Sequence, residues 1–117
     1  MTNSFRGEIA FPLGDKTVAV RPTLQKIAEI ETVYGSAVDM LDRLFKGTFK
    51  VTEVIGSCAI ILRGQAGLPQ GPKLMDYLFD EVGVNELVVP LGQWINAAGD
   101  RGRSLGEANA GQPEKSS

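Results

Sequence analysis

The stretch IAFPLGDKTVAV, residues 9–20, contains two apolar segments separated by a Gly-Asp pair at 14–15. Glycine at the first position of a two-residue loop favours a type II′ turn, so the two segments are predicted to form an antiparallel β-hairpin. The loop also sets the register, in which Phe11 faces Val18 on one apolar face. Two strands alone are marginally stable, so this face must pack against the rest of the chain.

The outer edges of the two predicted strands differ. Pro12 has no N–H group, and in this register that group would have pointed outward, so the proline blunts the edge of the first strand. The second strand keeps outward N–H groups at Thr17, Ala19 and Arg21. Either the segment Thr48–Val51 covers this edge as a third strand, or a partner does. In the second case, we expect the three residues to contact the partner.

Residues 23–98 have the apolar spacing of about five short helices. The first is predicted over 24–34, with Thr23 as its N-terminal cap and Gly35 as its stop. The residues expected on apolar stripes of these helices are Leu24, Ile27, Ile30, Tyr34, Val38, Leu41, Leu44, Phe45, Leu74, Met75, Leu78, Phe79, Val82, Leu87, Leu91, Trp94 and Ile95. The predicted fold class is therefore mainly α (α+β), with a hairpin over 5–22 packed on a helical bundle.

The segment EVIGSCAIILR, residues 53–63, is apolar on both sides, which is typical of a central, buried helix. Thr52 is the expected cap of this helix. Gly56 lies on a face that we expect to be tightly packed. Cys58 lies among apolar residues and is predicted to be an inert buried thiol, because reactive thiols need an accessible, electropositive setting.

The last predicted helix begins after Asn85, and Pro90 is expected to kink it or delay its start. Residues 99–117 contain only one large apolar side chain, Leu105. Such a segment cannot bury enough surface to offset its chain entropy, so it is predicted to be a disordered tail. Residues 1–98 are then a single globular domain.

The composition argues against several classes of function. The formal net charge is −2, whereas a general nucleic-acid binder usually has a basic surface. The chain has no histidine, and the carboxylates of Asp76 and Asp80 are expected to form a solvated acidic face rather than a metal site. No apolar run is long enough to cross a membrane. We therefore expect neither enzymatic activity nor a cofactor, metal, small-molecule substrate, nucleic acid or membrane as a partner.

Glu31 lies at the edge of the apolar stripe of the first predicted helix. A carboxylate in this position is usually a boundary residue that pairs with a lysine or arginine. The alternative is a contact with a partner protein. Both interpretations remain open from the sequence, and Glu31 joins the three strand residues as a predicted partner-binding residue.

An ordered set of short motifs resembles the tail assembly chaperone family of phages and gene transfer agents. The set consists of Arg6-Gly7-Glu8, Gly14-Asp15, Pro22-Thr23, the segment from Ala28 to Glu31, and Gly35, and VTEVIGSCAIILRGQAG then resembles the family's helix before a Gly-rich loop. The resemblance covers roughly residues 5–98 and implies a non-enzymatic protein of the host bacterium's cytoplasm. Its implied partners are the tape measure protein and the tail tube protein, with self-association as a further expectation.

Two other functions are compatible with a small helical protein. A helical DNA-binding regulator would need clustered basic and amide side chains on one helix, and no helix here has them. A structural tail component, such as a connector or a tube subunit, is the other alternative. Tube subunits are usually rich in β-structure, so a mainly helical chain favours the chaperone that coats the tape measure protein during tail tube assembly.

Overall fold

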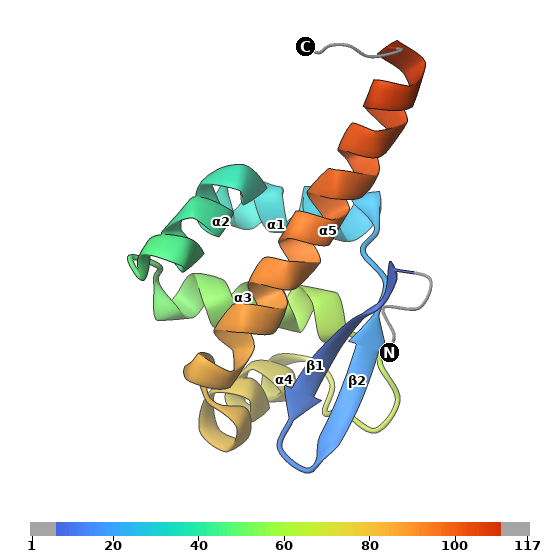
Figure 1. The fold of residues 1–117 in the computed structure, drawn as a ribbon. Helices are drawn as coiled ribbons and strands as arrows, with labels where there is room; N and C mark the ends of the chain where they lie inside the picture. The colour runs from blue at the N-terminus through green and yellow to red at the C-terminus, as the bar shows by residue number, and fades with distance from the viewer. Residues whose placement is uncertain (1–6, 111–117) are drawn as a thin grey trace.

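The computed structural model describes residues 7–110, with side chains described for residues 7–99. The elements are β1 (Ile9–Leu13), β2 (Lys16–Val20), α1 (Leu24–Tyr34), α2 (Ala37–Lys46), α3 (Val51–Leu62), α4 (Pro72–Tyr77), the π-helical turn η2 (Leu78–Val82) and α5 (Val84–Ala110). In Figure 1 the hairpin lies beside α5, and the other helices lie around α3. The predicted fold class, a hairpin on a bundle of five helices, is confirmed.

The hairpin has the predicted register. Phe11 pairs with Val18 and Ile9 pairs with Val20 in an antiparallel ladder. Gly14 has a φ angle of +70°, which the first residue of this class of two-residue turn requires. Phe11 is fully buried, so the apolar face of the hairpin is part of the core.

The segment Thr48–Val51 does not form a third strand. Residues 48–50 have no regular structure, Val51 is already helical, and the sheet in the described part of the chain contains only β1 and β2. The backbone N–H of Lys50 donates to the Glu53 carboxylate at 2.9 Å, and this bond lets α3 begin before Thr52, the expected cap. The outer edge of β2 is therefore not covered by this segment.

The central position predicted for the third helix is confirmed in α3. Eight of its side chains or backbone positions are buried, among them Gly56 and Cys58. Helices α1 and α5 both pack against α3. A continuous core of buried side chains connects α3 with the hairpin and α5.

Helix α2 buries only part of the apolar stripe predicted for it: Leu44 is buried as predicted, but Val38 and Phe45 are not. Val38 and Phe45 are 74% and 82% exposed, whereas Met40 and Leu44 are buried. The helix turns its Met40 side toward α3, where the Ser57 hydroxyl contacts the Met40 sulfur at 3.5 Å. Buried Ala37 lies on the same side, so two apolar stripes compete on α2 and the outer one stays at the surface.

The segment after α4 also departs from a regular helix. Met75 and Phe79 were predicted to face inward, but they are 40% and 57% exposed. The N–H of Gly83 donates to the carbonyl of Leu78 at 2.8 Å, which closes the wider π-helical turn η2. This turn breaks the 3.6-residue period on which the inward position of Phe79 was based, whereas Met75 lies before the turn, in α4. Leu74 and Leu78 are buried as predicted.

Helix α5 begins at Val84, so Asn85 lies inside its first turn and is not the cap. Pro90 is buried within the helix and does not delay its start. The helix continues through Ala110, whereas the sequence pattern ends it near residue 98. Once a helix has formed, each added residue gains a hydrogen bond that offsets the loss of its conformational entropy, so α5 extends past its last buried turn. The remaining part of the predicted tail, residues 111–117, lies outside the described residues.

Candidate protein-binding surface

An apolar groove lies between the N-terminal turns of α1 and α2 and the middle of α5. Its volume is about 690 Å³. The apolar lining comes from Leu24, Ile27, Val38, Leu41, Ile95 and Ala98. We call this feature the α1–α2–α5 groove. A concave, mainly apolar surface of this size is the kind of site at which proteins bind apolar groups of ligands or partners.

Two of the apolar side chains that line the groove are strongly exposed to solvent. Leu24 is the first residue of α1 and is 83% exposed, and Val38, the second residue of α2, is 74% exposed. Leu24 was predicted to lie on the core stripe of its helix, and this prediction is wrong because the buried residue of α1 comes later, at Ile30. Exposing such side chains to water is unfavourable, so a contiguous exposed set is typical of an interaction site.

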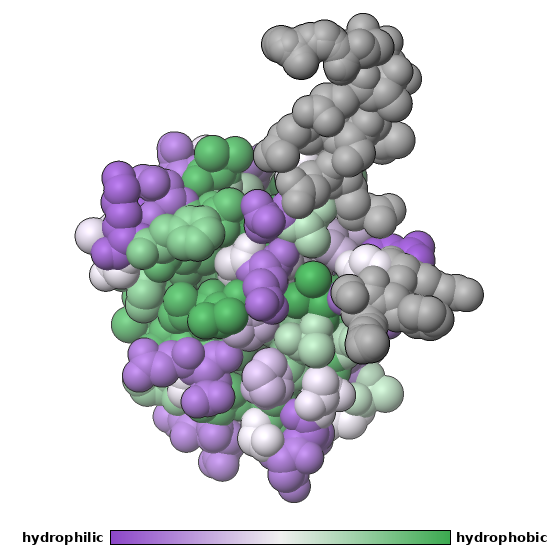
Figure 2. Space-filling model, viewed as in Figure 1, coloured by the Kyte–Doolittle hydropathy of each residue, from purple (hydrophilic) through white to green (hydrophobic). Residues whose placement is uncertain are grey.

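Exposed apolar side chains continue outside the groove. Figure 2 shows them gathered over α2 and the adjoining turns of α5. Phe45 on α2 and Val89 on α5 are 82% and 63% exposed. The groove is thus part of a larger apolar region on one side of the helical bundle.

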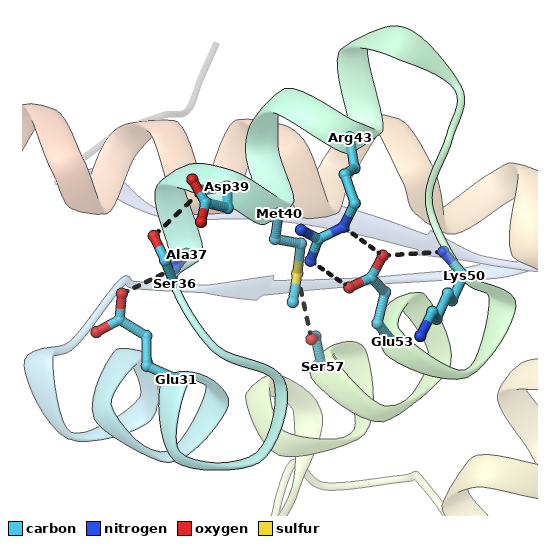
Figure 3. Close-up of polar contacts among 9 residues, drawn as sticks. All are labelled: Glu31, Ser36, Ala37, Asp39, Met40, Arg43, Lys50, Glu53 and Ser57. Atoms are coloured by element: carbon cyan, nitrogen blue, oxygen red, sulfur yellow. Dashed lines mark hydrogen bonds and ion pairs between the residues drawn. The ribbon is translucent and has the colours of Figure 1, made fainter.

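Glu31 lies on the wall of the groove and also holds two helices together. Its carboxylate accepts a hydrogen bond from the backbone N–H of Ala37 at 2.8 Å, as Figure 3 shows. This N–H is one of the unpaired donors in the first turn of α2, so the carboxylate acts as an additional cap. The expected pairing with a lysine or arginine is replaced by this backbone contact among the described residues.

The open edge of β2 meets the groove at Arg21. Thr17, Ala19 and Arg21 are all exposed, and within residues 7–110 β1 is the only strand that pairs with β2. Arg21 follows β2 directly and is also a lining residue of the α1–α2–α5 groove. Of the four predicted partner-binding residues, Thr17, Ala19 and Arg21 therefore lie along the strand edge. Glu31 lines the groove, and Arg21 belongs to both. Arg21 thus connects the strand edge to the groove.

Polar side chains inside the bundle form a network that the sequence analysis missed. The Glu53 side chain is 5% exposed and binds the Arg43 guanidinium at 2.6 Å and the N–H of Lys50 at 2.9 Å (Figure 3). Hydrogen bonding by Arg43 is the main reason that the pKa of Glu53 lies below its usual range. In the sequence, only the position of Glu53 three residues after Lys50 could have indicated this network, because a glutamate at that distance from the N-cap is the second half of a capping box. The network joins α2 to α3 and thereby fixes one wall of the groove.

The residues whose chemistry the sequence singled out are Cys58, Asp76 and Asp80. Cys58 is fully buried, and burial raises the pKa of its thiol, as expected for an inert cysteine. Asp76 and Asp80 are exposed, and the described residues contain no cluster of three side chains able to hold a metal ion. Within residues 7–110, no helix has both the length and the apolar character that crossing a bilayer requires. The surface is suited to binding by shape and apolar contact.

Comparison with known proteins identifies one family. A family model described as phage tail tube protein, GTA-gp10, matches residues 6–91, which include the whole hairpin and four of the five α-helices. No curated protein and no solved structure matches the chain significantly. This match supports the expected phage or gene transfer agent tail family, although the family is described as a tube protein rather than a chaperone. The protein belongs to the phage tail tube protein family typified by GTA-gp10.

Proposed function

We propose that this protein is a non-enzymatic structural component of a phage or gene transfer agent tail, and that it works by binding other tail proteins. The observation that carries this proposal is the surface formed by the α1–α2–α5 groove and the open β2 edge. Leu24 and Val38 are exposed apolar side chains that do not belong to the core, so burying them against a partner is favourable. The family description supports the tail as the setting.

A tail protein that binds its partners through this surface needs no reactive group. The groove offers apolar contact along Leu24, Val38 and Ile95, and its rim offers the Arg21 and Glu31 charges for orientation. The strand edge offers unpaired backbone groups, which bind an extended segment of another chain by strand addition. Both modes are reversible, and both work in the cytoplasm of the host, where we expect the tail to be built.

A second candidate is a chaperone that binds the tape measure protein and leaves before the tail is complete. Two observations favour it. The chain is mainly helical, with only two strands in the described part, and its groove is open in the isolated protein. A groove between helices is a suitable site for an amphipathic helix of a partner, and the tape measure protein is the partner that the family resemblance implies.

Quantification of the protein in purified particles separates the two candidates. Tails or particles would be purified from producing cells, and the chain would be measured against the tube protein by mass spectrometry, in the particles and in the lysate. A structural component is expected at a fixed ratio in both fractions. A chaperone is expected in the lysate and to be depleted at least tenfold from the particles. A protein that copurifies with no tail protein in either fraction would contradict both.

A further inference from the structure

The two edges of the hairpin are not equivalent. The β1 edge contains Pro12, which has no N–H group, and α5 packs against β1. The β2 edge contains no proline, and in Figure 1 it lies on the side of the hairpin away from α5. The loop between α3 and α4 comes close to the turn end of β2, where the Lys16 side chain donates to the Gly67 carbonyl at 3.0 Å. A strand that adds to this sheet can therefore add only beside β2.

The hydrogen-bonding pattern of β2 identifies the groups that point outward. Leu13 and Lys16 flank the two-residue turn and form a hydrogen-bonded pair, so the pairs alternate from there. Thr17 and Ala19 are consequently in non-hydrogen-bonded pairs with β1, and their N–H and C=O groups point away from it. We extend the same alternation by one pair to Arg21, which directly follows Val20, the last residue of the ladder, and all three residues are exposed.

We propose that two copies of this protein pair through their β2 edges, antiparallel and with Ala19 facing Ala19 of the second copy. The proposal extends the proposed function, since it names the partner of the strand-edge half of the surface. A two-fold axis through Ala19 places Thr17 opposite Arg21 of the second copy. All outward backbone groups of this segment then find partners, which gives a four-stranded sheet with the order β1-β2-β2-β1.

The side chains suit this register. On the core-facing side, Val18 lies opposite Val20 of the second copy, so two β-branched residues meet. On the other side, the small Ala19 residues meet at the axis, where larger side chains would crowd. Asp15 of the second copy lies diagonally to Arg21 and close to the N-terminus of α1, two positions that favour a negative charge. No like charges face each other.

The symmetry of the pair follows from the blocked β1 edge. Because only one edge of each sheet is available, the contact uses the same surface on both copies and closes after two subunits. Open-ended addition, which would give fibres, requires the β1 edge as well. An edge of this length buries less area than a standard interface, so we expect a reversible dimer whose population rises with concentration.

Sedimentation equilibrium of the full chain over a wide concentration range tests whether the dimer exists. The unmodified protein should approach twice the 12.5 kDa mass of one chain. Ala19→Pro removes one outward donor and spares the internal ladder, so this variant should stay monomeric with an unchanged circular dichroism spectrum. The matched control is Ala10→Pro, which changes the residue paired with Ala19 on the other strand and should leave the dimer intact.

Disulfide trapping tests the register and remains informative if a proline variant fails to fold. Ala19→Cys places two thiols about 5.5 Å apart between Cα atoms, within the range of a disulfide, and should give a covalent dimer on mild oxidation. Thr17→Cys is the control, because its two copies lie about 14 Å apart in this register and should not link. Cys58 is buried and should not compete.

Three results would overturn the proposal. The first is a protein that is monomeric at all concentrations and whose Ala19→Cys variant forms no disulfide-linked dimer. The second is equal disulfide formation in the two cysteine variants, and the third is a folded Ala19→Pro variant that dimerises as strongly as the unmodified protein. None of these results would affect the proposed role in the tail, which is measured by the presence of the protein in particles and by its binding to other tail proteins.

Discussion

The hydroxyl end of Tyr34 occupies the space directly above Gly56. A β-carbon added to Gly56 would lie 1.6 Å from the Tyr34 hydroxyl oxygen and 2.6 Å from the ring carbon that bears it. The Tyr34 side chain of α1 therefore lies so close to the backbone of α3 that a β-carbon at position 56 would force it to move. This contact holds α1, one wall of the groove, against the central helix.

Gly56→Ala is accordingly expected to destabilise the protein. Alanine in place of glycine gains up to about 1 kcal/mol in helix propensity, but the displaced Tyr34 ring costs about 1–3 kcal/mol, so we expect a net loss in the free energy of unfolding. Urea denaturation measures it. Tyr34→Leu in the same chain should restore part of the loss, as a double-mutant cycle would show.

Gly92→Ala is the matched control for this prediction. Its β-carbon would meet the nearest atom, on Leu41, at 3.7 Å, which is an ordinary contact. This variant should be as stable as the parent or more stable, by up to about 1 kcal/mol. Equal effects of alanine at Gly56 and Gly92 would contradict the close contact with Tyr34.

The Glu31 carboxylate should contribute to stability as well as to the groove surface. Glu31→Ala removes the acceptor for the Ala37 N–H and is expected to cost about 0.5–2 kcal/mol, the usual range for a lost helix cap. Glu31→Gln keeps an acceptor oxygen and should lose less. The midpoint of urea unfolding distinguishes the two. An Ala variant as stable as the parent would show that the hydrogen bond contributes nothing.

The buried Glu53 carboxylate should make the protein sensitive to acid. Its pKa in the folded state is lowered from the ordinary value of 4.5, chiefly by the hydrogen bonds from Arg43. The unfolded chain therefore takes up the proton first as the pH falls. The stabilising effect is fully present above about pH 4.5 and is lost as the pH decreases through that value toward the folded pKa.

Thermal unfolding measured between neutral pH and pH 3 tests this dependence. Arg43→Met removes the main cause of the lowered pKa, so its stability should fall less steeply with acid than that of the parent. The exposed Glu29–Arg63 pair is present in both proteins and cancels from the comparison. Parallel acid profiles of the two proteins would contradict the assignment to Glu53.

The hairpin could be predicted because its signals are local. The glycine turn at Gly14 fixes the register, and alternation then decides which side of each strand is buried. The signal for the start of α1 was equally local, since the Thr23 hydroxyl oxygen caps the helix by accepting a hydrogen bond from the N–H of Lys26. The central position of α3 followed from apolar residues on both of its sides.

The remaining features depend on contacts between distant residues. Val38 and Phe45 form an apolar stripe as regular as the buried one, and only the docking of α2 on α3 decides which stripe faces water. The π-helical turn after Tyr77 leaves no clear signal in the sequence. The strand edge and Glu31 could be predicted as partner-binding residues from the sequence, but the groove beside them requires the positions of three helices.

Binding of the cognate tail tube and tape measure proteins to groove variants tests the central claim most directly. Leu24→Asp and Val38→Asp place charges in the groove at exposed positions, so both variants should fold normally. Val33→Asp is the control, because Val33 is 62% exposed but is not among the residues that line the groove. By isothermal titration calorimetry, we predict that the parent and Val33→Asp bind at least one of the two proteins equally well, and that both groove variants bind it at least tenfold more weakly. Unchanged affinity of the folded groove variants would contradict the claim that this surface binds other tail proteins.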